Sequence, residues 1–294
     1  MAGWRAPATD RQEAPYAAPM SSQPSNPEPL DASALRSALA GLVGDLDIVA
    51  STGSTNADLL AAARDGARDR SVLVAERQDR GRGRLDRQWV SAPGSGLTFS
   101  VLLRPEQVPV ARLGWLPLLT GLSVVRAIQD LSDVAVALKW PNDVLLGPDQ
   151  AKCAGILAEA EPRAAGLAVV VGIGINVGAR ADELPDGGTS LAAEGVGVGR
   201  SELLGAVLRR LLTDEAAWRD AGGDPDAVGL REAYRGACAT LGREVRVSLP
   251  DGSGLVAHAR DLDVDGRLVL RESSGASRTV AAGDIVHLRA LPAS

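Results

Sequence analysis

The stretch AGILAEAEPRAAGLAVVVGIGINV, residues 154–177, decides the architecture of the chain. Two strand-like segments flank the turn sequence PRAAG, so we expect a β-hairpin. The second segment is interrupted by glycines and is too short to cross a bilayer. GIGINVG also offers the start of a dinucleotide-binding motif, but turn residues follow it where that motif needs a helix. We favour a strand whose glycines let a ligand or another strand approach the backbone closely.

Outward from this hairpin, β-rich segments alternate with segments of helical period. Asp31 is a plausible cap for a helix over residues 31–42, and Thr55 with Asp58 three residues later forms a helix-start box. We expect further strands at residues 47–50, 71–78, 96–105 and 134–140, and further helices at residues 111–131, 200–220 and 226–239. The body is therefore a mixture of helices and strands.

Both ends of the chain differ from this body. From about residue 240, short strand-like segments are separated by PDGSG, VDGR and SSGAS turns, which is typical of a small antiparallel barrel. Residues 1–29 are rich in Pro, Ala and Ser and lack periodicity, so we expect a disordered tail. The chain is therefore predicted to be an α+β protein with a tail at 1–29, a main domain at 30–238 and a C-terminal domain at 239–294.

Composition excludes several classes of function. A formal net charge of -6 argues against a broad nucleic-acid surface. No basic region followed by an apolar core begins the chain, so we expect no secretory signal, no membrane segment and a cytoplasmic location. Cys153, Cys238, His258 and His287 have no spacing typical of zinc or iron–sulfur sites, and no histidine lies near a candidate nucleophile. We expect buried thiols and histidines on or within the barrel.

Two rare residue types gather in short stretches. The chain has only two lysines, Lys139 and Lys152, although arginine fills its other basic positions. An ammonium group is compact and adaptable where a guanidinium is planar, so lysine is expected where that difference matters. Three of the few asparagines, Asn56, Asn142 and Asn176, lie in the stretches STGSTN, KWPND and GIGINVG. Asparagine also suits turns, which is the structural alternative for this set.

A basic loop, DRGRGRLDRQW at residues 79–89, supplies the third cluster. Its glycines give flexibility and backbone donors, and its arginines can bind carboxylate or phosphate oxygens in bidentate fashion. Trp89 can stack on a planar ring. In a net-acidic chain, such a loop favours a clamp for a small anion over a contact to nucleic acid.

Together these stretches resemble the biotin protein ligase family. The resemblance runs from about residue 47 to residue 290 and rests on STGSTN, ERQDRGRGRLDRQW, GLTFSVLL, LKWPNDVLL, AKCAGILAE and GIGINV, in that order. It implies a central mixed β-sheet with flanking helices, as in biotin and lipoate ligases, followed by an SH3-like C-terminal barrel. It also implies two-step chemistry, in which biotin and Mg-ATP form biotinyl-5'-AMP and a lysine of a carrier domain then accepts the biotin.

The same resemblance assigns roles to individual residues. Lys152 and Arg82 would be the catalytic cations, because a carboxylate and an α-phosphate repel each other and need positive charge between them. The biotin-binding residues would be Ser54, Thr55, Asn56, Gln78, Gly81, Arg82, Lys152 and Gly155. The residues for ATP or the adenylate would be Arg84, Arg87, Trp89, Lys139, Asn142, Asp143 and Asn176. Magnesium would arrive with ATP rather than on a cluster of protein ligands.

The partner implied is the biotin carboxyl carrier domain of an acyl-CoA or pyruvate carboxylase.

Two features depart from the family pattern. Asp86 stands where many members have glycine, which adds a negative charge beside the anion clamp. Some bacterial members carry an N-terminal winged helix, whereas about 30 residues without helical period precede the main domain here, so we expect no repressor activity and no nucleic-acid partner.

Two alternatives and one question remain open at this stage. A lipoate-type carrier-protein ligase would share the fold and the adenylate chemistry, although the basic loop and the barrel favour biotin. A non-catalytic binding module would use the same loop and barrel to recruit a partner without nucleotide turnover. The oligomeric state has no signature in the sequence.

Overall fold

The main domain is built on one mixed sheet, as the sequence predicts. A computed structural model describes residues 29–84, 87–163, 166–248, 253–281 and 284–287. Its seven-stranded sheet has the order β1-β2-β3-β7-β6-β5-β4, in which β1 and β2 are parallel and every other pair is antiparallel. The strands are β1 (Leu46–Val49), β2 (Val72–Ala75), β3 (Gly96–Leu103), β4 (Val136–Lys139), β5 (Asp143–Leu146), β6 (Ala151–Arg163) and β7 (Gly166–Asn176).

The predicted hairpin forms the centre of this sheet. β6 and β7 pair from Ala154–Ile175 to Arg163–Gly166, so the turn lies where PRAAG places it. The glycines of β7 leave room for side chains on the sheet surface, because a Cβ on Gly172 would overlap Asn56 and one on Gly174 would overlap Trp89. The groups that approach this backbone closely are the side chains of Asn56 and Trp89 rather than another strand, and the approach of a ligand stays a prediction.

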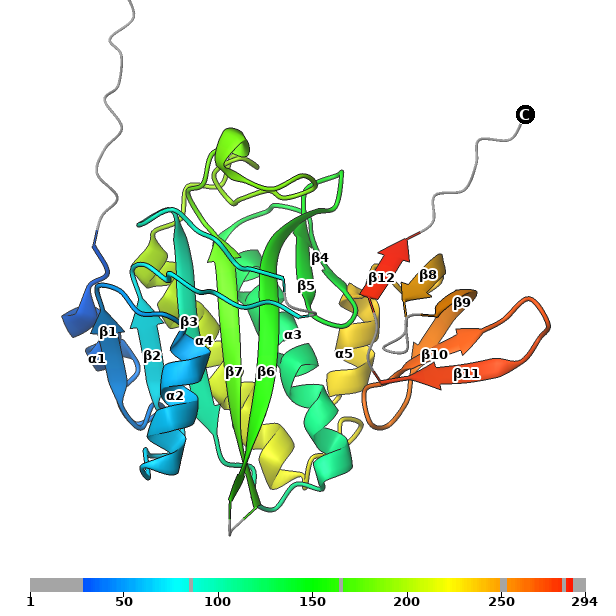
Figure 1. The fold of residues 1–294 in the computed structure, drawn as a ribbon, viewed down its shortest axis with the longest axis horizontal. Coiled ribbons are helices and arrows are strands. Elements are labelled where there is room, and N and C mark those ends of the chain that lie inside the picture. Colours follow the sequence, from blue (N-terminus) through cyan, green and yellow to red (C-terminus); the bar gives the residue numbers. More distant parts are fainter. Residues whose placement is uncertain (1–28, 85–86, 164–165, 249–252, 282–283, 288–294) are drawn as a thin grey trace, which may run out of the picture.

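Helices cover the sheet unequally (Figure 1). α2 (Thr55–Arg64) lies alone on one face, across β2, β3, β6 and β7. α3 (Trp115–Leu131) and α4 (Arg200–Asp220) cover the other face and pack on each other. α1 (Ala32–Ala38) contacts α4, α5 (Leu230–Ala237) contacts α3, and short 3₁₀ helices lie at Val110–Gly114 and Ala181–Glu183. The face beside α2 is therefore the less covered one.

Two local predictions differ from the structure. Helix α2 is capped by Ser54, whose hydroxyl accepts from the amide of Ala57, so Thr55 is the first helical residue and the box predicted from Thr55 and Asp58 is wrong. Asp58 instead contacts the Thr52 hydroxyl. Strand β5 was not predicted, because the four residues from Asp143 to Leu146 are too short to display a period. The cap at Asp31 is confirmed by its 2.9 Å bond from the amide of Ala34.

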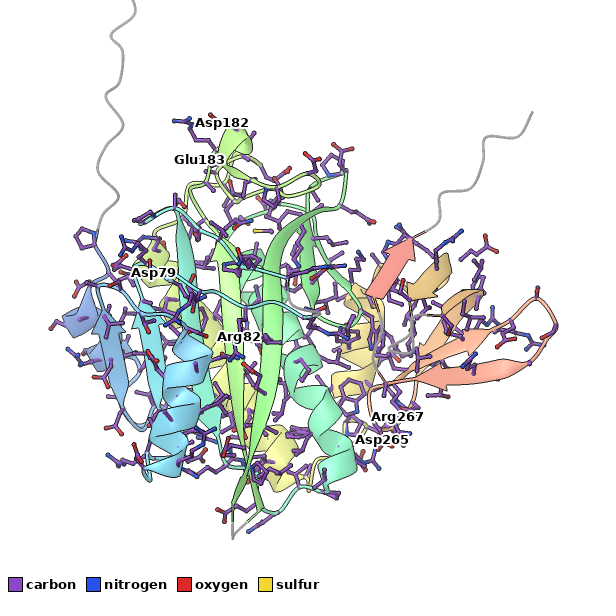
Figure 2. All side chains as sticks on the ribbon, in the orientation of Figure 1. Asp79, Arg82, Asp182, Glu183, Asp265 and Arg267 are labelled. Carbon is purple, nitrogen blue, oxygen red and sulfur yellow. The ribbon has the colours of Figure 1, made fainter. Side chains whose placement is uncertain are left out.

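The C-terminal residues form a separate antiparallel sheet of the SH3-like type. Its order is β11-β10-β9-β8-β12, from β8 (Glu244–Ser248), β9 (Gly254–Leu262), β10 (Leu268–Arg271), β11 (Ser277–Val280) and β12 (Asp284–His287). Trp115 and Trp140 of the main domain donate their indole N–H groups to the carbonyls of Val264 and Gly266, at 3.0 and 3.1 Å. Figure 2 shows Asp265 and Arg267 in the same turn, beside the main domain. The domain boundary at 238/239 itself stays a prediction.

The core explains the remaining apolar segments. Among the described residues one helical stretch, Val110–Leu131, is long and apolar enough to cross a membrane. Most of α3 is buried here against α4 and the strands from β4 to β7, so its composition serves the core. Cys153 and Cys238 are free and buried, as predicted, and burial raises the pKa of the Cys153 thiol to about 12.

Candidate active site

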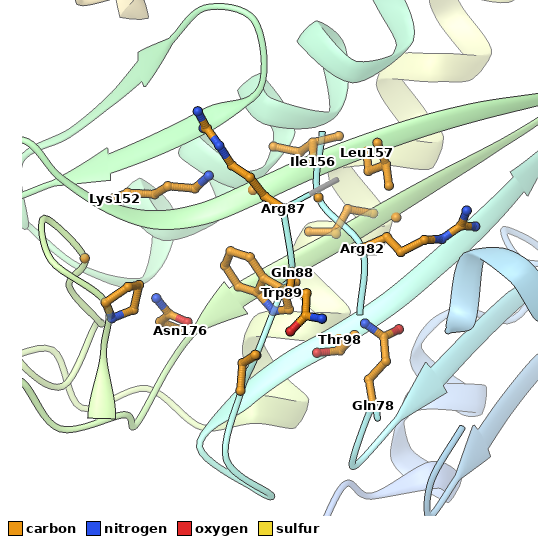
Figure 3. A pocket seen from close by; sticks show the side chains of 18 of the residues that line it. Gln78, Arg82, Arg87, Gln88, Trp89, Thr98, Lys152, Ile156, Leu157 and Asn176 are labelled. Atoms are coloured by element: carbon orange, nitrogen blue, oxygen red, sulfur yellow. The ribbon is translucent and has the colours of Figure 1, made fainter. Parts of the chain in front are cut away.

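A cleft of about 730 Å³ lies on the α2 face of the sheet. Its walls come from the first turn of α2, the basic loop at 79–89, strands β6 and β7, and the segment 182–188. All of the predicted site residues line it except Gly81 and Lys139. Figure 3 shows Lys152 and Arg82 on opposite sides of Trp89, which divides the cleft into two ends. We call them the lysine end, around Lys152, Asp143 and Asn176, and the glutamine end, around Gln78, Thr55 and Arg82.

The lysine end is organised by one carboxylate. Asp143 begins β5 and Lys152 lies near the start of the neighbouring β6, and Lys152 Nζ is 2.6 Å from Asp143 Oδ1. Lys139 Nζ is 4.0 Å from the other oxygen of Asp143, so both lysines of the chain gather on this one carboxylate. The Lys152 side chain is 37% exposed and the Asp143 side chain 16%, which leaves the ammonium accessible from the cleft.

Asparagines fix the backbone around this end. Asn142 donates to the carbonyl of Ile156 at 3.0 Å and accepts from Arg84 at 3.4 Å, so it joins the basic loop to the β4–β5 turn. Asn176 is buried and donates to the carbonyl of Thr189 at 3.0 Å, which holds the chain beyond β7 against the cleft. Both amides therefore have structural bonds in addition to any ligand contact.

The glutamine end is a connected network of polar side chains. Gln78 Oε1 accepts from the Thr55 amide at 2.9 Å and from its hydroxyl at 3.2 Å. Ser100 Oγ lies 2.7 Å from Thr55 Oγ1 and 2.6 Å from Asn56 Oδ1. Asn56 Nδ2 donates to the carbonyl of Leu157 and, at 2.8 Å, to Glu159. Thr55, Asn56 and Ser100 are buried, so this network fixes the start of α2 against β3 and β6.

Arg82 closes that network from the loop side. Its Nη2 lies 3.1 and 3.2 Å from the two carboxylate oxygens of Glu159. In Figure 3 the guanidinium of Arg82 points away from Lys152. The two predicted catalytic cations thus lie at different ends of the cleft, each paired with a carboxylate.

The basic loop returns on itself beside the glycine strand. The Trp89 amide donates to the Gly81 carbonyl at 3.0 Å, and Arg82 pairs with Gln88 in an isolated antiparallel bridge. A Cβ on Gly81 would overlap the Trp89 carbonyl, so this return requires glycine. The indole of Trp89 lies over Gly174 and beside Gly155, with Lys152 Nζ 6.0 Å from its ring centre. Asp86 lies outside the described residues.

Sequence reasoning missed three parts of the site. In the sequence, Ser100 is one polar residue inside an apolar strand. Glu159 is one of two glutamates on β6, which the sequence indicates only as surface carboxylates. The segment 182–188 lines the cleft beside Asn176, although its sequence, DELPDGG, is rich in turn residues. Figure 2 shows Asp182 and Glu183 at the outer tip of this segment. No signal in a single sequence identifies these residues, because their partners are distant along the chain.

Among the described residues no group of three or more His, Cys, Asp or Glu side chains is arranged to hold a metal ion. Oxygen ligands suit magnesium, and such ions commonly use one or two carboxylates together with substrate phosphates. Asp143 and Asn176 offer side-chain oxygens at the lysine end. This donor set fits an ion that is brought in and mostly ligated by a nucleotide.

Comparison with known proteins identifies the family. The Biotin/lipoate A/B protein ligase family model matches residues 50–176, and the Biotin protein ligase C terminal domain model matches residues 240–288. A biotin--[acetyl-CoA-carboxylase] ligase of Mycobacterium tuberculosis is 44% identical over 89% of this chain and 97% of its own length. The bifunctional ligase/repressor BirA of Bacillus subtilis is 32% identical, over 80% of this chain and 71% of its own length.

Solved structures agree with this assignment. The biotin protein ligase from Aquifex aeolicus in complex with biotin and ATP superposes with a TM-score of 0.69 at 28% identity, covering 84% of this chain and all of that one. The family models and this superposition therefore extend over both the main domain and the C-terminal domain. By sequence and by fold, the chain belongs to the biotin protein ligase family.

Proposed function

We propose that the cleft joins biotin to ATP and passes the biotin to a carrier domain. The observation that carries this proposal is the gathering of the predicted residues around one cleft, with Lys152 in its wall. Biotin would take the glutamine end, where Ser54, Thr55 and Gln78 offer polar atoms to its ureido ring. Its carboxylate would then extend toward Lys152 and Gly155. ATP would take the lysine end, near Arg84, Arg87, Trp89, Asn142, Asp143 and Asn176, with Mg²⁺ carried on its phosphates.

In the first step a carboxylate oxygen of biotin attacks the α-phosphorus of ATP. The bond to the β-phosphate breaks, pyrophosphate leaves, and biotinyl-5'-AMP remains. Both reactants are anionic, so a fixed cation between them offsets their repulsion and the charge that develops at phosphorus. Lys152 is suited to that role because Asp143 holds its ammonium at the cleft wall, 2.6 Å from the carboxylate. Arg82 would contribute the second positive charge from the glutamine end.

In the second step a lysine amine of the carrier attacks the anhydride carbonyl. AMP leaves, the amine loses a proton, and an amide bond to biotin forms. Water would destroy the same anhydride, so the basic loop is expected to cover the adenylate until the acceptor arrives. The acceptor proposed is a biotin carboxyl carrier domain of an acyl-CoA or pyruvate carboxylase. ATP chemistry and two free cysteines fit a cytoplasmic location.

The decisive experiment is pyrophosphate release from Mg-ATP with biotin, with lipoate and with neither acid, followed by transfer to a purified carrier domain. Release and labelling that depend on biotin are the expected result. Release with lipoate alone would assign the chain to the lipoate branch of the fold. If the protein is folded but releases no pyrophosphate with biotin and none with lipoate, the ligase proposal is contradicted and a binding module is favoured.

A further inference from the structure

Glu159 is a charged residue of the glutamine end that the proposed chemistry does not use. It lies on β6, and its carboxylate binds Arg82 of the basic loop and Asn56 of α2 at the same time. Glu159 does not line the cleft, whereas both of its partners do. Any effect of Glu159 on a bound ligand must therefore pass through another side chain.

The contact to Arg82 is partly shielded from water. The Glu159 side chain is 25% exposed and the Arg82 side chain 50%. Within the described part of the chain Glu159 is the carboxylate that lies within ion-pair distance of Arg82. Both carboxylate oxygens lie close to the same Nη2, at 3.1 and 3.2 Å, so the contact is a charge-assisted hydrogen bond shared between two acceptors.

Hydrogen bonds from buried side chains hold the Glu159 carboxylate in place. Asn56 uses Nδ2 on Glu159 and on the Leu157 carbonyl while its Oδ1 faces Ser100, so the carboxylate is held from the buried side. The same network continues through Thr55 to Gln78. Gln78 precedes Gly81 and Arg82 follows it, so the polar network fastens the basic loop on both sides of its first glycine.

We propose that Glu159 is a positioning residue: through Arg82 it fixes the basic loop against β6 and thereby shapes the biotin subsite. The inference rests on the proposed function for the identity of the ligand, but the fixing of the loop is a property of the protein alone. Loss of the charge should affect the ATP end less, since that end has its own contacts, Lys152 to Asp143 and Arg84 to Asn142.

Glu159→Gln keeps the size of the side chain and removes its charge. We expect the KM for biotin to rise about tenfold, which is typical for loss of a hydrogen bond to a charged group, while the KM for ATP changes less than about twofold. Limited trypsin digestion of the ligand-free protein should cut faster after Arg84. Glu159→Asp, which restores the charge on a shorter stem, should recover part of both effects.

The chain supplies a matched control two residues away. Glu161 is on the same strand and binds Arg64 of α2 at 2.8 and 2.7 Å, outside the cleft. Glu161→Gln also breaks an Arg–Glu ion pair of β6, but with α2 instead of the basic loop, and should leave the KM for biotin and the loop cleavage unchanged. In addition, Glu159→Gln should add nothing to Arg82→Gln, because the two residues act as a unit.

The outcomes separate the two proposals. If the unmodified protein releases no pyrophosphate with biotin, the proposed function fails, and trypsin digestion still decides whether Glu159 fixes the loop. An active Glu159→Gln protein with unchanged biotin KM and unchanged cleavage would overturn the inference. Equal effects of Glu159→Gln and Glu161→Gln would also overturn it, by showing a general loss of stability. If Glu159→Gln does not fold, unchanged cleavage and KM in Glu159→Asp would overturn it equally.

Discussion

The two ends of the cleft both hold a cation against a carboxylate, yet they differ in where the carboxylate lies. At the lysine end, Asp143 lines the cleft beside Lys152, so an incoming anion meets cation and carboxylate together. At the glutamine end, Glu159 lies behind Arg82 and outside the cleft. An ion pair inside a cleft is part of the electrostatic field that a ligand enters, whereas one behind the wall fixes the shape of that wall.

The largest test of this contrast is Lys152→Ala. Adenylate formation should fall by about 100- to 1000-fold, as expected when a charge-stabilising group is removed from a transition state. The melting temperature should change little, because the side chain is 37% exposed and adds little to the core. Single-turnover pyrophosphate release measures the effect. A folded variant with a near-normal rate would show that the lysine end does not carry the chemistry.

A substitution between the two ends should disturb both. In Gly174→Ala the new methyl group would overlap the indole of Trp89. We expect the ring to move and the KM values for biotin and ATP each to rise about tenfold, in line with the cost of overpacking. Intrinsic fluorescence would report the ring movement. Gly236→Ala is the control, since a Cβ there meets nothing within 4 Å, and a normal Gly174→Ala enzyme would contradict the proposed position of Trp89.

Lys139 tests how far the lysine end extends. Its Nζ is 4.0 Å from Asp143 and it does not line the cleft. Lys139→Met should therefore lower adenylate formation by less than about threefold, the size of a weak ion pair. Steady-state rates compared with Lys152→Met measure the difference. Equal losses in the two variants would show that the lysines act as one unit.

The pH range for these comparisons is set outside the cleft, at His287. Burial, with help from the charges of Arg243 and Lys139, lowers the pKa of His287 to about 4. A histidine whose pKa is lower in the folded state than in the unfolded chain contributes its full stability above about pH 6.5 and loses it as the pH falls toward 4. Thermal unfolding between pH 7 and 4.5 should show a loss on the order of 2 kcal/mol from this residue.

His287→Gln is the matched variant for that measurement. It should flatten the part of the pH dependence that lies below about pH 6.5, because the proton uptake on unfolding is removed. Identical pH profiles for the two proteins would show that His287 does not titrate on unfolding. Kinetic comparison of the two cleft ends is best made above pH 6.5, where this contribution is constant.

A structural feature can be predicted from the sequence when the residues that produce it are close together along the chain. The β6–β7 hairpin is local: two strand-like runs and a turn are enough to predict it, and the pairing confirms it. Short β5 was missed because its four residues gain their strand geometry from neighbours on both sides. The cap of α2 was misplaced by one residue, because Ser54 and Thr55 have the same capping chemistry and only the backbone distinguishes them.

The site divides in the same way. Motif residues such as Lys152 and Gln78 are recognisable from their order along the chain, and the structure brings them to one cleft. Glu159 and Ser100 have no such signal, because their importance arises from partners 77 residues and about 45 residues away. Residues that act through long-range polar networks are thus the part of this active site that could not be predicted from a single sequence.

The junction between the two sheets has a consequence for how the molecule unfolds. Trp115 and Trp140 are buried, and within the described part of the chain the acceptors of their N–H groups are carbonyls of the turn at residues 264–266. Undocking the small sheet would exchange both hydrogen bonds for bonds to water, at a net cost of about 0.5–1.5 kcal/mol each, and would expose indole surface that now packs against the turn. Amides of α3 and of the C-terminal sheet should therefore exchange with solvent as one cooperative unit, so that damage to either domain is felt by the other.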